Sequence, residues 1–498
     1  ELSDNVQNWI YKNNVGGELI NVDNTIIGAG NLGWNGSPTP ITNELGGTII
    51  ASGKNPLSIH PGSQVFTNRG ECRADGGTLQ LHSTFDNTNG GLIEARDGSN
   101  VELIQTSISG GTLRALGNAE FLTLGGTSHL DGTAENVVMH GMHRIQNGAI
   151  LTANGTLENH GTIRLDSTGG ATYFRPLNSP LMLTGGGTIE LSDGVQNWIY
   201  KNNTGGELIN VDNTMIGAGN IGWNGSPTAI TNMPGGTIIA DGTNALICDP
   251  GSQTFTNMGV MSATAGSNLT IRRGLQNAGG TVDIPAGATV RIEGPMTVTG
   301  GEITGVGTLA TVGATTLDSV TLKPGESPGI LNLTGNMPIQ TATTVTEIEI
   351  GGFTPGAQHD QINVTGSARF GGTLRVRSVN GYVPAVGDSF RIFNYANHSP
   401  SADRYTSFES VGFPGILTVR VDYEADHANI VIVAVGDINC DGAITVSDIA
   451  PLVIALTDPE NYEMLFPNCP ILDADINGDG EITVADIGPF VALLTGGG

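Results

Sequence analysis

Gly46-Gly47-Thr48-Ile49 is one copy of the short motif that decides the fold of this chain. Further copies, each two glycines followed by Thr and an aliphatic residue, occupy 76–79, 110–113, 186–189, 235–238, 279–282 and 371–374. Short alternating stretches such as Thr289-Val290-Arg291-Ile292 lie between them. Strands of three to five residues punctuated by Gly and Asn are typical of a solenoid coil. Helical spacing of apolar residues is nearly absent before residue 440.

The pattern predicts a mainly β protein, with a parallel β-solenoid over residues 1–335. The inward residue of each strand is aliphatic, and the outward one is Thr, Asn or Arg. We expect Gly and Asn to take the corners, where the chain turns with a positive φ. The alternative is a series of small antiparallel sandwiches, which the irregular strand spacing disfavours.

A large internal duplication lies within this region. Residues 1–51 recur as 190–240, with differences only at positions 5, 15, 26, 32, 40, 44 and 45, and a weaker match extends the two copies to 1–64 and 190–253. Trp9 and Trp34 in the first copy, and Trp198 and Trp223 in the second, are all the tryptophans of the chain. They form a candidate interaction surface, for stacking on sugar rings or entering a pocket of a neighbour. Alternatively, they only hold loops against the solenoid.

Residues 336–435 have longer strands with turn signals between them. The expected strands span 344–350, 373–379, 389–395, 416–423 and 428–435. This pattern predicts an antiparallel β domain that caps the solenoid, because an uncovered sheet edge invites pairing with another chain.

Two 12-residue loops near the C-terminus have the spacing of calcium sites. Oxygen ligands are expected at positions 1, 3, 5 and 12, with a backbone carbonyl at position 7 and Gly at position 6. The candidate ligands are Asp437, Asn439, Asp441, Ala443 and Asp448 in the first loop, and Asp475, Asn477, Asp479, Glu481 and Asp486 in the second. Each loop runs into an apolar helix, expected at 449–456 and 487–494. The sequence therefore predicts a module over 436–498 that binds two Ca²⁺ ions.

This duplicated loop and exiting helix resembles a type I dockerin. The resemblance implies a module that folds on calcium and attaches its protein to a cohesin on a scaffold or cell surface. The family's cohesin contact uses adjacent hydroxyl residues before the position-12 Asp, and only Ser447 fits that pattern here. Cys440 and Cys469 bracket the first loop and helix, as a candidate disulfide of an oxidising exterior or as free buried thiols.

Another stretch is similar to the closing segment of autotransporter-like bacterial surface repeat proteins. It consists of Asp360-Gln361-Ile362-Asn363-Val364-Thr365-Gly366, Gly371-Gly372-Thr373-Leu374 and Pro384-Ala385-Val386-Gly387-Asp388-Ser389-Phe390. Together with a dockerin-like tail, it resembles extracellular proteins of the planctomycete type. The resemblance implies export and a structural role at or outside the cell surface.

Composition excludes several classes of protein. Charged residues make up 13% of the chain and the net charge is −27, which disfavours a coiled coil and a nucleic-acid partner. The 75 glycines do not recur at every third position, which excludes collagen. No apolar run reaches the roughly 18 residues that a membrane span requires.

These observations favour a secreted, non-enzymatic structural protein: a subunit of a surface layer, an adhesin or a filament. The chain begins in the middle of its duplicated pattern, so an open solenoid edge and head-to-tail assembly with itself are expected. A cohesin-like protein or a cell-surface glycan is the other expected partner. The alternative is a dockerin-bearing polysaccharide lyase, glycosidase or glycan-binding protein. Its candidate acid pairs, Asp131 with Glu135 and Asp241 with Asp249, cannot be ranked from sequence.

Overall fold

The computed structural model describes residues 1–13, 16–201, 206–325, 327–398, 403–413, 417–467, 469–477 and 481–495. The protein is mainly β, with a solenoid of about 14 turns, and helices account for 7% of it. Its contacts divide the chain into two compact units, Glu1–Gly301 and Glu302–Gly498. The predicted β-solenoid is confirmed, because neighbouring strands of successive turns pair in parallel, which a series of antiparallel sandwiches would not do.

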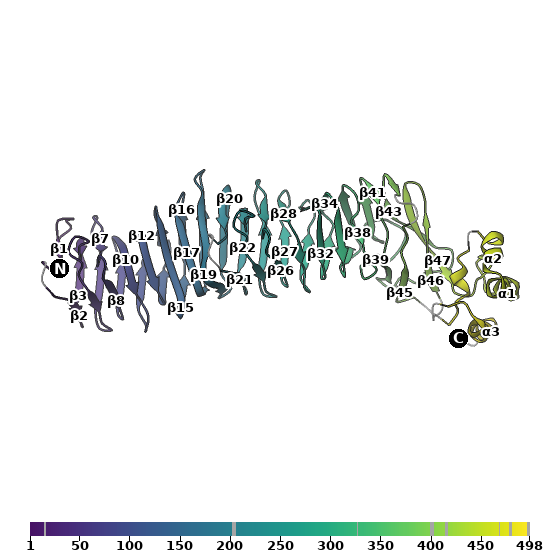
Figure 1. Ribbon diagram of the computed structural model, residues 1–498, viewed down its shortest axis with the longest axis horizontal. Helices are drawn as coiled ribbons and strands as arrows, with labels where there is room; N and C mark the ends of the chain where they lie inside the picture. The colour runs from purple at the N-terminus through teal and green to yellow at the C-terminus, as the bar shows by residue number, and fades with distance from the viewer. Residues whose placement is uncertain are drawn as a thin grey trace. The chain divides into compact units, whose positions relative to one another are not determined.

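Each turn of the first unit adds strands to three parallel ladders, here called A, B and C (Figure 1). Ladder A contains β1 (Trp9–Ile10), β4 (Gly30–Leu32), β7 (Leu57–Ile59), β10 (Thr78–Asp86), β12 (Asn100–Ser109), β14 (Glu120–Thr123), β16 (Met142–Gln146), β18 (Thr162–Asp166), β20 (Thr188–Ile199), β22 (Thr214–Ile221), β24 (Thr237–Ala240), β27 (Val260–Ala263) and β30 (Thr281–Ile284). Several long strands bend from one ladder into the next, as register shifts within β10 and β20 show.

Ladder B contains β2 (Leu19–Asn21), β5 (Ile41–Asn43), β8 (Val65–Asn68), the second halves of β10 and β12, β15 (Thr127–His140), β17 (Ile150–Asn159), β19 (Thr172–Thr184), the second halves of β20 and β22, β25 (Leu246–Cys248), β28 (Asn268–Arg272) and β31 (Thr289–Glu293). Ladder C contains β3 (Thr25–Gly28), β6 (Thr48–Ala51), β9 (Glu71–Ala74), β11 (Leu92–Ala95), β13 (Gly111–Ala115), the second halves of β15, β17 and β19, β21 (Leu208–Asn210), β23 (Ile230–Asn232), β26 (Phe255–Asn257), β29 (Leu275–Gln276) and β32 (Met296–Thr299).

The core of this unit consists of columns of buried side chains, to which each turn contributes one residue at the matching position. Ile49, Cys72, Ile93 and Leu113 occupy matching positions on successive strands of ladder C, and all four side chains are fully buried. Because side chains alternate across each strand, the residues between them face outward. Parallel pairing in register thus converts the short alternating stretches of the sequence into a continuous apolar interior.

Buried asparagines line two corners of the solenoid. In the first stack, each side-chain amide donates to the amide oxygen one turn further on: Asn21 to Asn43 (2.8 Å), Asn43 to Asn68 (2.9 Å) and Asn68 to Asn87 (2.7 Å). The second stack runs from Asn210 through Asn232 and Asn257 to Asn277. The prediction that asparagines take positive-φ corners was wrong for these residues, because among the described asparagines only Asn89, Asn178 and Asn380 do so.

Replacement of Asn68 by Ala should destabilise its turn by about 2–3 kcal/mol, because it removes two buried hydrogen bonds of the stack, the one from Asn43 Nδ2 and the one to Asn87 Oδ1. Native-state amide hydrogen exchange of β5, β8 and β10 measures the effect. The control is Thr67→Ala on the same strand, whose side chain faces outward. Equal exchange in the two variants would contradict the role given to the stack.

The second unit begins with further parallel strands. They are β33 (Glu302–Gly305), β34 (Thr308–Val312), β35 (Thr315–Asp318), β36 (Thr321–Pro324), β37 (Ile330–Thr334), β38 (Ile339–Gln340), β39 (Val345–Ile350), β40 (Gln361–Val364), β41 (Ser367–Ala368), β42 (Thr373–Ser378), β43 (Ser389–Asn394), β44 (Asn397–His398), β45 (Ser407–Val411), β46 (Leu417–Tyr423) and β47 (His427–Ala434). Parallel pairing continues from β33 through β36, β39 and β42 to β45.

Only β43, β46 and β47 pair antiparallel among the described strands of this unit. The prediction of an antiparallel domain from residue 336 was therefore only partly right, since the parallel ladder extends beyond 335 as far as Val411. The physical reason is that apolar–polar alternation marks a half-buried strand whichever way its neighbours run.

The chain ends in a small helical module. Its elements are the 3₁₀ turns η1 (Val446–Asp448), η2 (Ile471–Ala474) and η3 (Val484–Asp486), and the helices α1 (Ile449–Thr457), α2 (Pro459–Leu465) and α3 (Ile487–Leu494). The two predicted helices are confirmed as α1 and α3. Helix α2 was not predicted, although Asp458 caps its first turn and Pro459 stands at its first position. No helix in the described ranges is long and apolar enough to cross a membrane.

Candidate calcium-binding module

The first loop curls around the carboxylate of Asp437. This side chain is 4% exposed and accepts backbone hydrogen bonds from Asp441 (3.1 Å) and Gly442 (2.9 Å). Gly442 has a φ of +92°, which permits the sharp turn at position 6 of the loop. The backbone N–H of Asp441 also donates to Asn439 Oδ1 at 2.8 Å. The turn of the loop therefore brings the side-chain oxygens of Asn439 and Asp437 to the same backbone N–H group.

The last residue of each loop closes it and starts the helix. Asp448 is fully buried and accepts from the backbone N–H groups of Asn439 (3.0 Å) and Thr445 (2.9 Å). Thr445 and Asp448 form a capping box for η1. In the second loop, Asp486 accepts from Asn477 (3.1 Å) and Thr483 (2.8 Å) in the same way. The two loops are thus built alike at position 12.

The remaining predicted ligands differ between the two loops in what the structure describes. Asp441 uses its two oxygens within the loop, where it accepts from Ala443 N and from the Asn439 amide, both at 3.0 Å. Ala443 follows at position 7. In the second loop, Asp475, Asn477 and Glu481 occupy the expected positions, and Asp479 lies outside the described residues.

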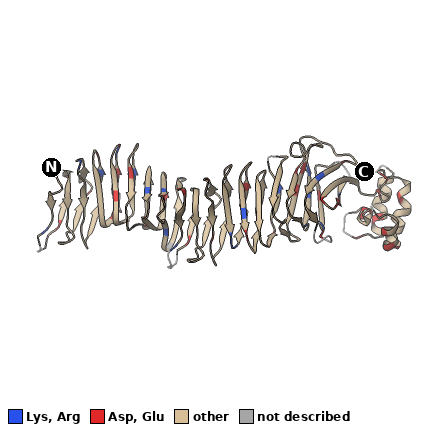
Figure 2. Ribbon diagram, turned by 90° about the horizontal axis from the view of Figure 1, so that it is seen from above, with Lys and Arg blue, Asp and Glu red and all other residues tan. Residues whose placement is uncertain are grey.

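The electrostatics of the module suit a hard cation. Residues 436–498 contain no Lys, Arg or His, so every charged side chain there is acidic; Figure 2 shows only acidic colouring on these helices. Burial raises the pKa of Asp437, and the nearby carboxylates of Asp448 and Asp441 raise it further. Buried carboxylates beside carbonyl and amide oxygens are a donor set that fits Ca²⁺. Asp437, Asn439, Asp441, Ala443 and Asp448 would hold the ion in the first loop.

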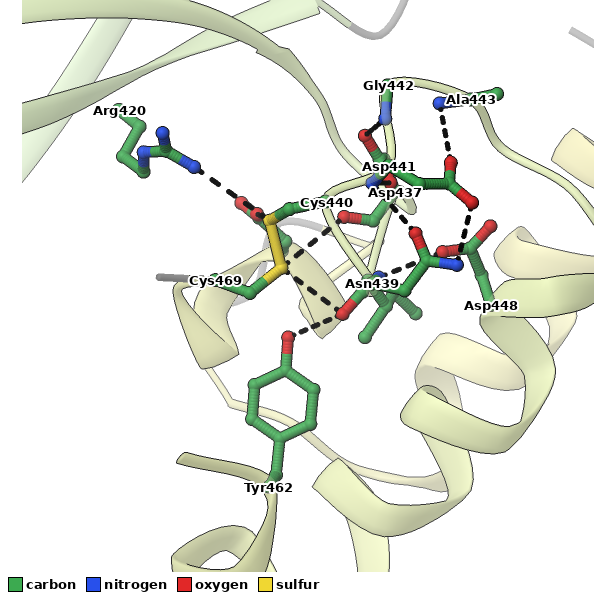
Figure 3. Close-up of a disulfide and its surroundings, with 12 residues drawn as sticks. Arg420, Asp437, Asn439, Cys440, Asp441, Gly442, Ala443, Asp448, Tyr462 and Cys469 are labelled. Atoms are coloured by element: carbon green, nitrogen blue, oxygen red, sulfur yellow. Dashed lines mark hydrogen bonds between the residues drawn. A yellow bond between two sulfur atoms is a disulfide. The ribbon is translucent and has the colours of Figure 1, made fainter. Parts of the chain in front are cut away.

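A disulfide closes the first loop and helix. Cys440 and Cys469 are bonded, with their Cα atoms 5.8 Å apart (Figure 3). The Asp473 carboxylate lies 3.7 Å from Cys440 Sγ, and burial raises the pKa of Asp473 to about 7, although Arg420 opposes this shift. Because the two sulfurs are bonded to each other, they do not form a thiolate metal site with Asp473. Cys72 and Cys248 are free and fully buried in the solenoid.

Several residues that build this module were not predicted from the sequence. The fully buried Tyr462 donates its hydroxyl to the carbonyl of Ile438 at 2.7 Å. The repeated Thr-x-x-Asp spacing of Thr445 with Asp448, and of Thr483 with Asp486, was a readable signal for the capping boxes. No sequence signal marked Asp473 or Arg420, because folding alone brings them to the disulfide.

The tryptophans form two exposed clusters with neighbouring tyrosines. In the first, Tyr11 contacts Trp9 and Trp34 edge-on, with ring centroids 6.1 and 5.5 Å apart. In the second, Tyr200 contacts Trp198 (5.9 Å) and Trp223 (5.2 Å). Trp9, Trp34 and Trp223 remain 43–45% exposed, whereas Trp198 is half-buried and Tyr200 is 6% exposed, with its hydroxyl accepting from Arg175 at 3.1 Å. The structure therefore brings each duplicated pair together at the surface.

The candidate catalytic acids form local hydrogen bonds and ion pairs. Asp131 accepts from the Thr133 hydroxyl at 2.6 Å, and Glu135 from Asn89 N at 2.8 Å. The carboxylate of Asp249 pairs with Arg273 at 3.1 Å. Asp241 accepts from the Thr264 hydroxyl at 2.8 Å. The contact of Asp131 stays within one turn, and those of Glu135, Asp249 and Asp241 link separate turns.

Comparison with known proteins gives no relative from which a function could be transferred: no family model matches the chain, and no curated protein matches it.

Loss of the disulfide should destabilise the helical module by about 3–4 kcal/mol, the loop-closure value for a 29-residue separation. The test is Cys440→Ser/Cys469→Ser, followed by hydrogen exchange of α1 and α2. As a control without any substitution, the oxidised and reduced wild-type chains are compared. The free thiols Cys72 and Cys248 are left unchanged because both are buried in the solenoid core. Unchanged protection of α1 after reduction would contradict the expected stabilisation.

Proposed function

We propose that this protein is an extracellular structural protein, a calcium-stabilised β-solenoid subunit of a surface layer, adhesin or head-to-tail filament. The observation that carries the proposal is the all-acidic C-terminal module closed by a disulfide. A disulfide is typical of an oxidising, extracellular compartment. Acidic loops in a module that contains no Lys, Arg or His suit divalent cations, which are abundant outside cells.

The outward charges of the solenoid support a structural role. On ladder C, Glu94 lies between Arg96 and Arg114, which both donate to it at 2.6 Å. On ladder A, Arg144 bridges Glu120 (2.6 Å) and Asp166 (2.9 Å) on neighbouring turns. Figure 2 shows acidic and basic residues near one another on several strands of the solenoid. Ion pairs arranged from turn to turn reinforce the stacking of turns, as a load-carrying scaffold requires.

A second candidate function is attachment to a glycan or to a cohesin-like scaffold protein. The exposed tryptophan clusters favour glycan binding, and the dockerin-like loops favour a protein scaffold. In that case the solenoid is a glycan-binding or polysaccharide-active domain carried by the C-terminal module.

Calcium should bind to both loops and protect α1 and α3 from hydrogen exchange. Asp448→Ala removes one carboxylate ligand together with the cap of η1, so we expect loss of one of two binding events in calorimetric titration with CaCl₂. Glu460→Ala, on α2 and outside both loops, is the control and should bind two ions. Two full binding events in Asp448→Ala would contradict the assignment of the first site.

Assembly should depend on the same ions. Negative-stain electron microscopy of the purified chain in calcium is expected to show regular polymers that separate after EDTA is added. Polymers that persist in EDTA would show that calcium does not lock the joint. Single particles in both conditions would remove self-assembly and favour the attachment function.

A further inference from the structure

The two aromatic clusters are held in place by polar contacts that leave the rings free. Ser37 donates its hydroxyl to the Lys12 carbonyl at 2.7 Å, and Lys12 N donates to Thr39 Oγ1 at 3.2 Å. Ser37 and Thr39 are 4% and 3% exposed. These contacts fasten the backbone of Lys12 to the turn that follows Trp34, whose carbonyl accepts from Ser37 N at 3.0 Å.

The second copy repeats these polar contacts, although Tyr200 is only 6% exposed and Trp198 is half-buried. Ser226 donates to the Lys201 carbonyl at 2.7 Å, and Lys201 N donates to Thr228 Oγ1 at 3.1 Å. A glycine also lies against each outer indole: a Cβ atom on Gly36 would come within 2.5 Å of the Trp34 ring, and one on Gly225 within 2.4 Å of Trp223. One face of the Trp34 and Trp223 indoles thus packs against backbone, which restricts the orientation of these two rings in the absence of a ligand.

The surroundings of the first cluster fit a sugar ring. A hollow of about 210 Å³ lies beside Tyr11 and is also lined by Lys12 and Glu18. This volume is below the roughly 300 Å³ at which pockets for drug-sized ligands begin, so it suits a single ring. Aromatic faces bind the apolar side of a sugar, and the neighbouring charged groups can bind its hydroxyls. A net charge of −27 disfavours an anionic polymer and favours a neutral one.

The two clusters lie on different faces of the solenoid. Trp9 belongs to ladder A, which reaches β20 after eight steps from strand to strand. Trp198 lies further along β20, where this strand has passed into ladder B and pairs with Tyr173 of β19. The offset of 189 residues therefore corresponds to eight turns and one further face.

We propose that the clusters Trp9–Tyr11–Trp34 and Trp198–Tyr200–Trp223 are two binding sites for neutral polysaccharide, aimed in different directions so that one protein cross-links two polymer chains. A single straight polymer that follows one face of the solenoid meets only one of them. The proposal requires neither calcium nor self-assembly, so it can fail or succeed independently of the proposed function.

Tryptophan fluorescence of the full chain tests binding directly, because all four tryptophans belong to these clusters. Titration with hydroxyethyl cellulose, a soluble neutral β-glucan, should shift the emission, and polygalacturonate at the same concentration should not. The shift should persist in EDTA. An unchanged emission spectrum with the neutral polymer would overturn the proposal, and so would an equal response to the anionic one.

Variants test the two-site geometry. In affinity electrophoresis with hydroxyethyl cellulose, the double variants Trp9→Ala/Trp34→Ala and Trp198→Ala/Trp223→Ala should each still be retarded. When wild-type protein is mixed with the polymer in solution, cross-linking should raise light scattering, and both double variants should lose this rise. The fourfold variant should bind at least about tenfold more weakly, from the loss of one or more aromatic contacts. Phe353→Ala, which removes an exposed ring elsewhere, is the matched control and should behave as wild type.

Two outcomes would overturn the cross-linking proposal. Scattering that persists in both double variants would show that separate sites are not required. If the fourfold variant instead loses self-association in sedimentation and keeps polymer binding, the clusters dock a second copy of this chain. Circular dichroism verifies folding, and the fourfold Trp→Phe variant, which keeps an aromatic ring at each position, should retain retardation if the alanine variant does not fold.

Discussion

Parallel pairing in register is the constraint on which the rest of this structure depends. Each strand forms its backbone hydrogen bonds with the strands of the turns before and after it. A residue that is buried in one turn therefore pairs with residues that are buried in the neighbouring turns. This is why Ile49 and Cys72 share one buried column although the chain travels around the whole coil between them. The same register aligns the amides of Asn43 and Asn68 and brings Arg144 between two acids. Core, corner and surface therefore follow from one pattern of pairing.

The C-terminal module follows a different principle. Its core is small and is built around Tyr462, Leu452 and Phe490, and small cores need additional constraints to remain folded. The Cys440–Cys469 bond provides one such constraint. The buried carboxylates of Asp437 and Asp448 lower the stability of the module unless a bound cation compensates their charge. Stability of this module and occupancy of its loops are for that reason expected to be linked.

Much of the fold could be predicted from the sequence because a solenoid repeats its signals. The Gly-Gly-Thr motif marked the strands, and the apolar periods after Asp448 and Asp486 marked the helices. The end of the parallel ladder could not be located, since Thr373–Ser378 alternates in the same way whichever direction its partner runs. At the candidate calcium site, the ligand spacing was readable, whereas the approach of Asp473 to the disulfide depends on three-dimensional packing. The position of Trp198 on a different face from Trp9 required the register of every intervening strand.

The asparagine stacks give the solenoid a property that its apolar columns lack. Each amide from Asn21 to Asn87 donates in the same direction along the stack. Rotating a single amide would set donor against donor on one side and acceptor against acceptor on the other. All amides of the stack must therefore have the same orientation, or all must be rotated together. Hydrogen bonds aligned in this way polarise one another. An error in the pairing of one of these turns would therefore disturb the amides of its neighbours, so the stack favours the correct register across the turns that it joins.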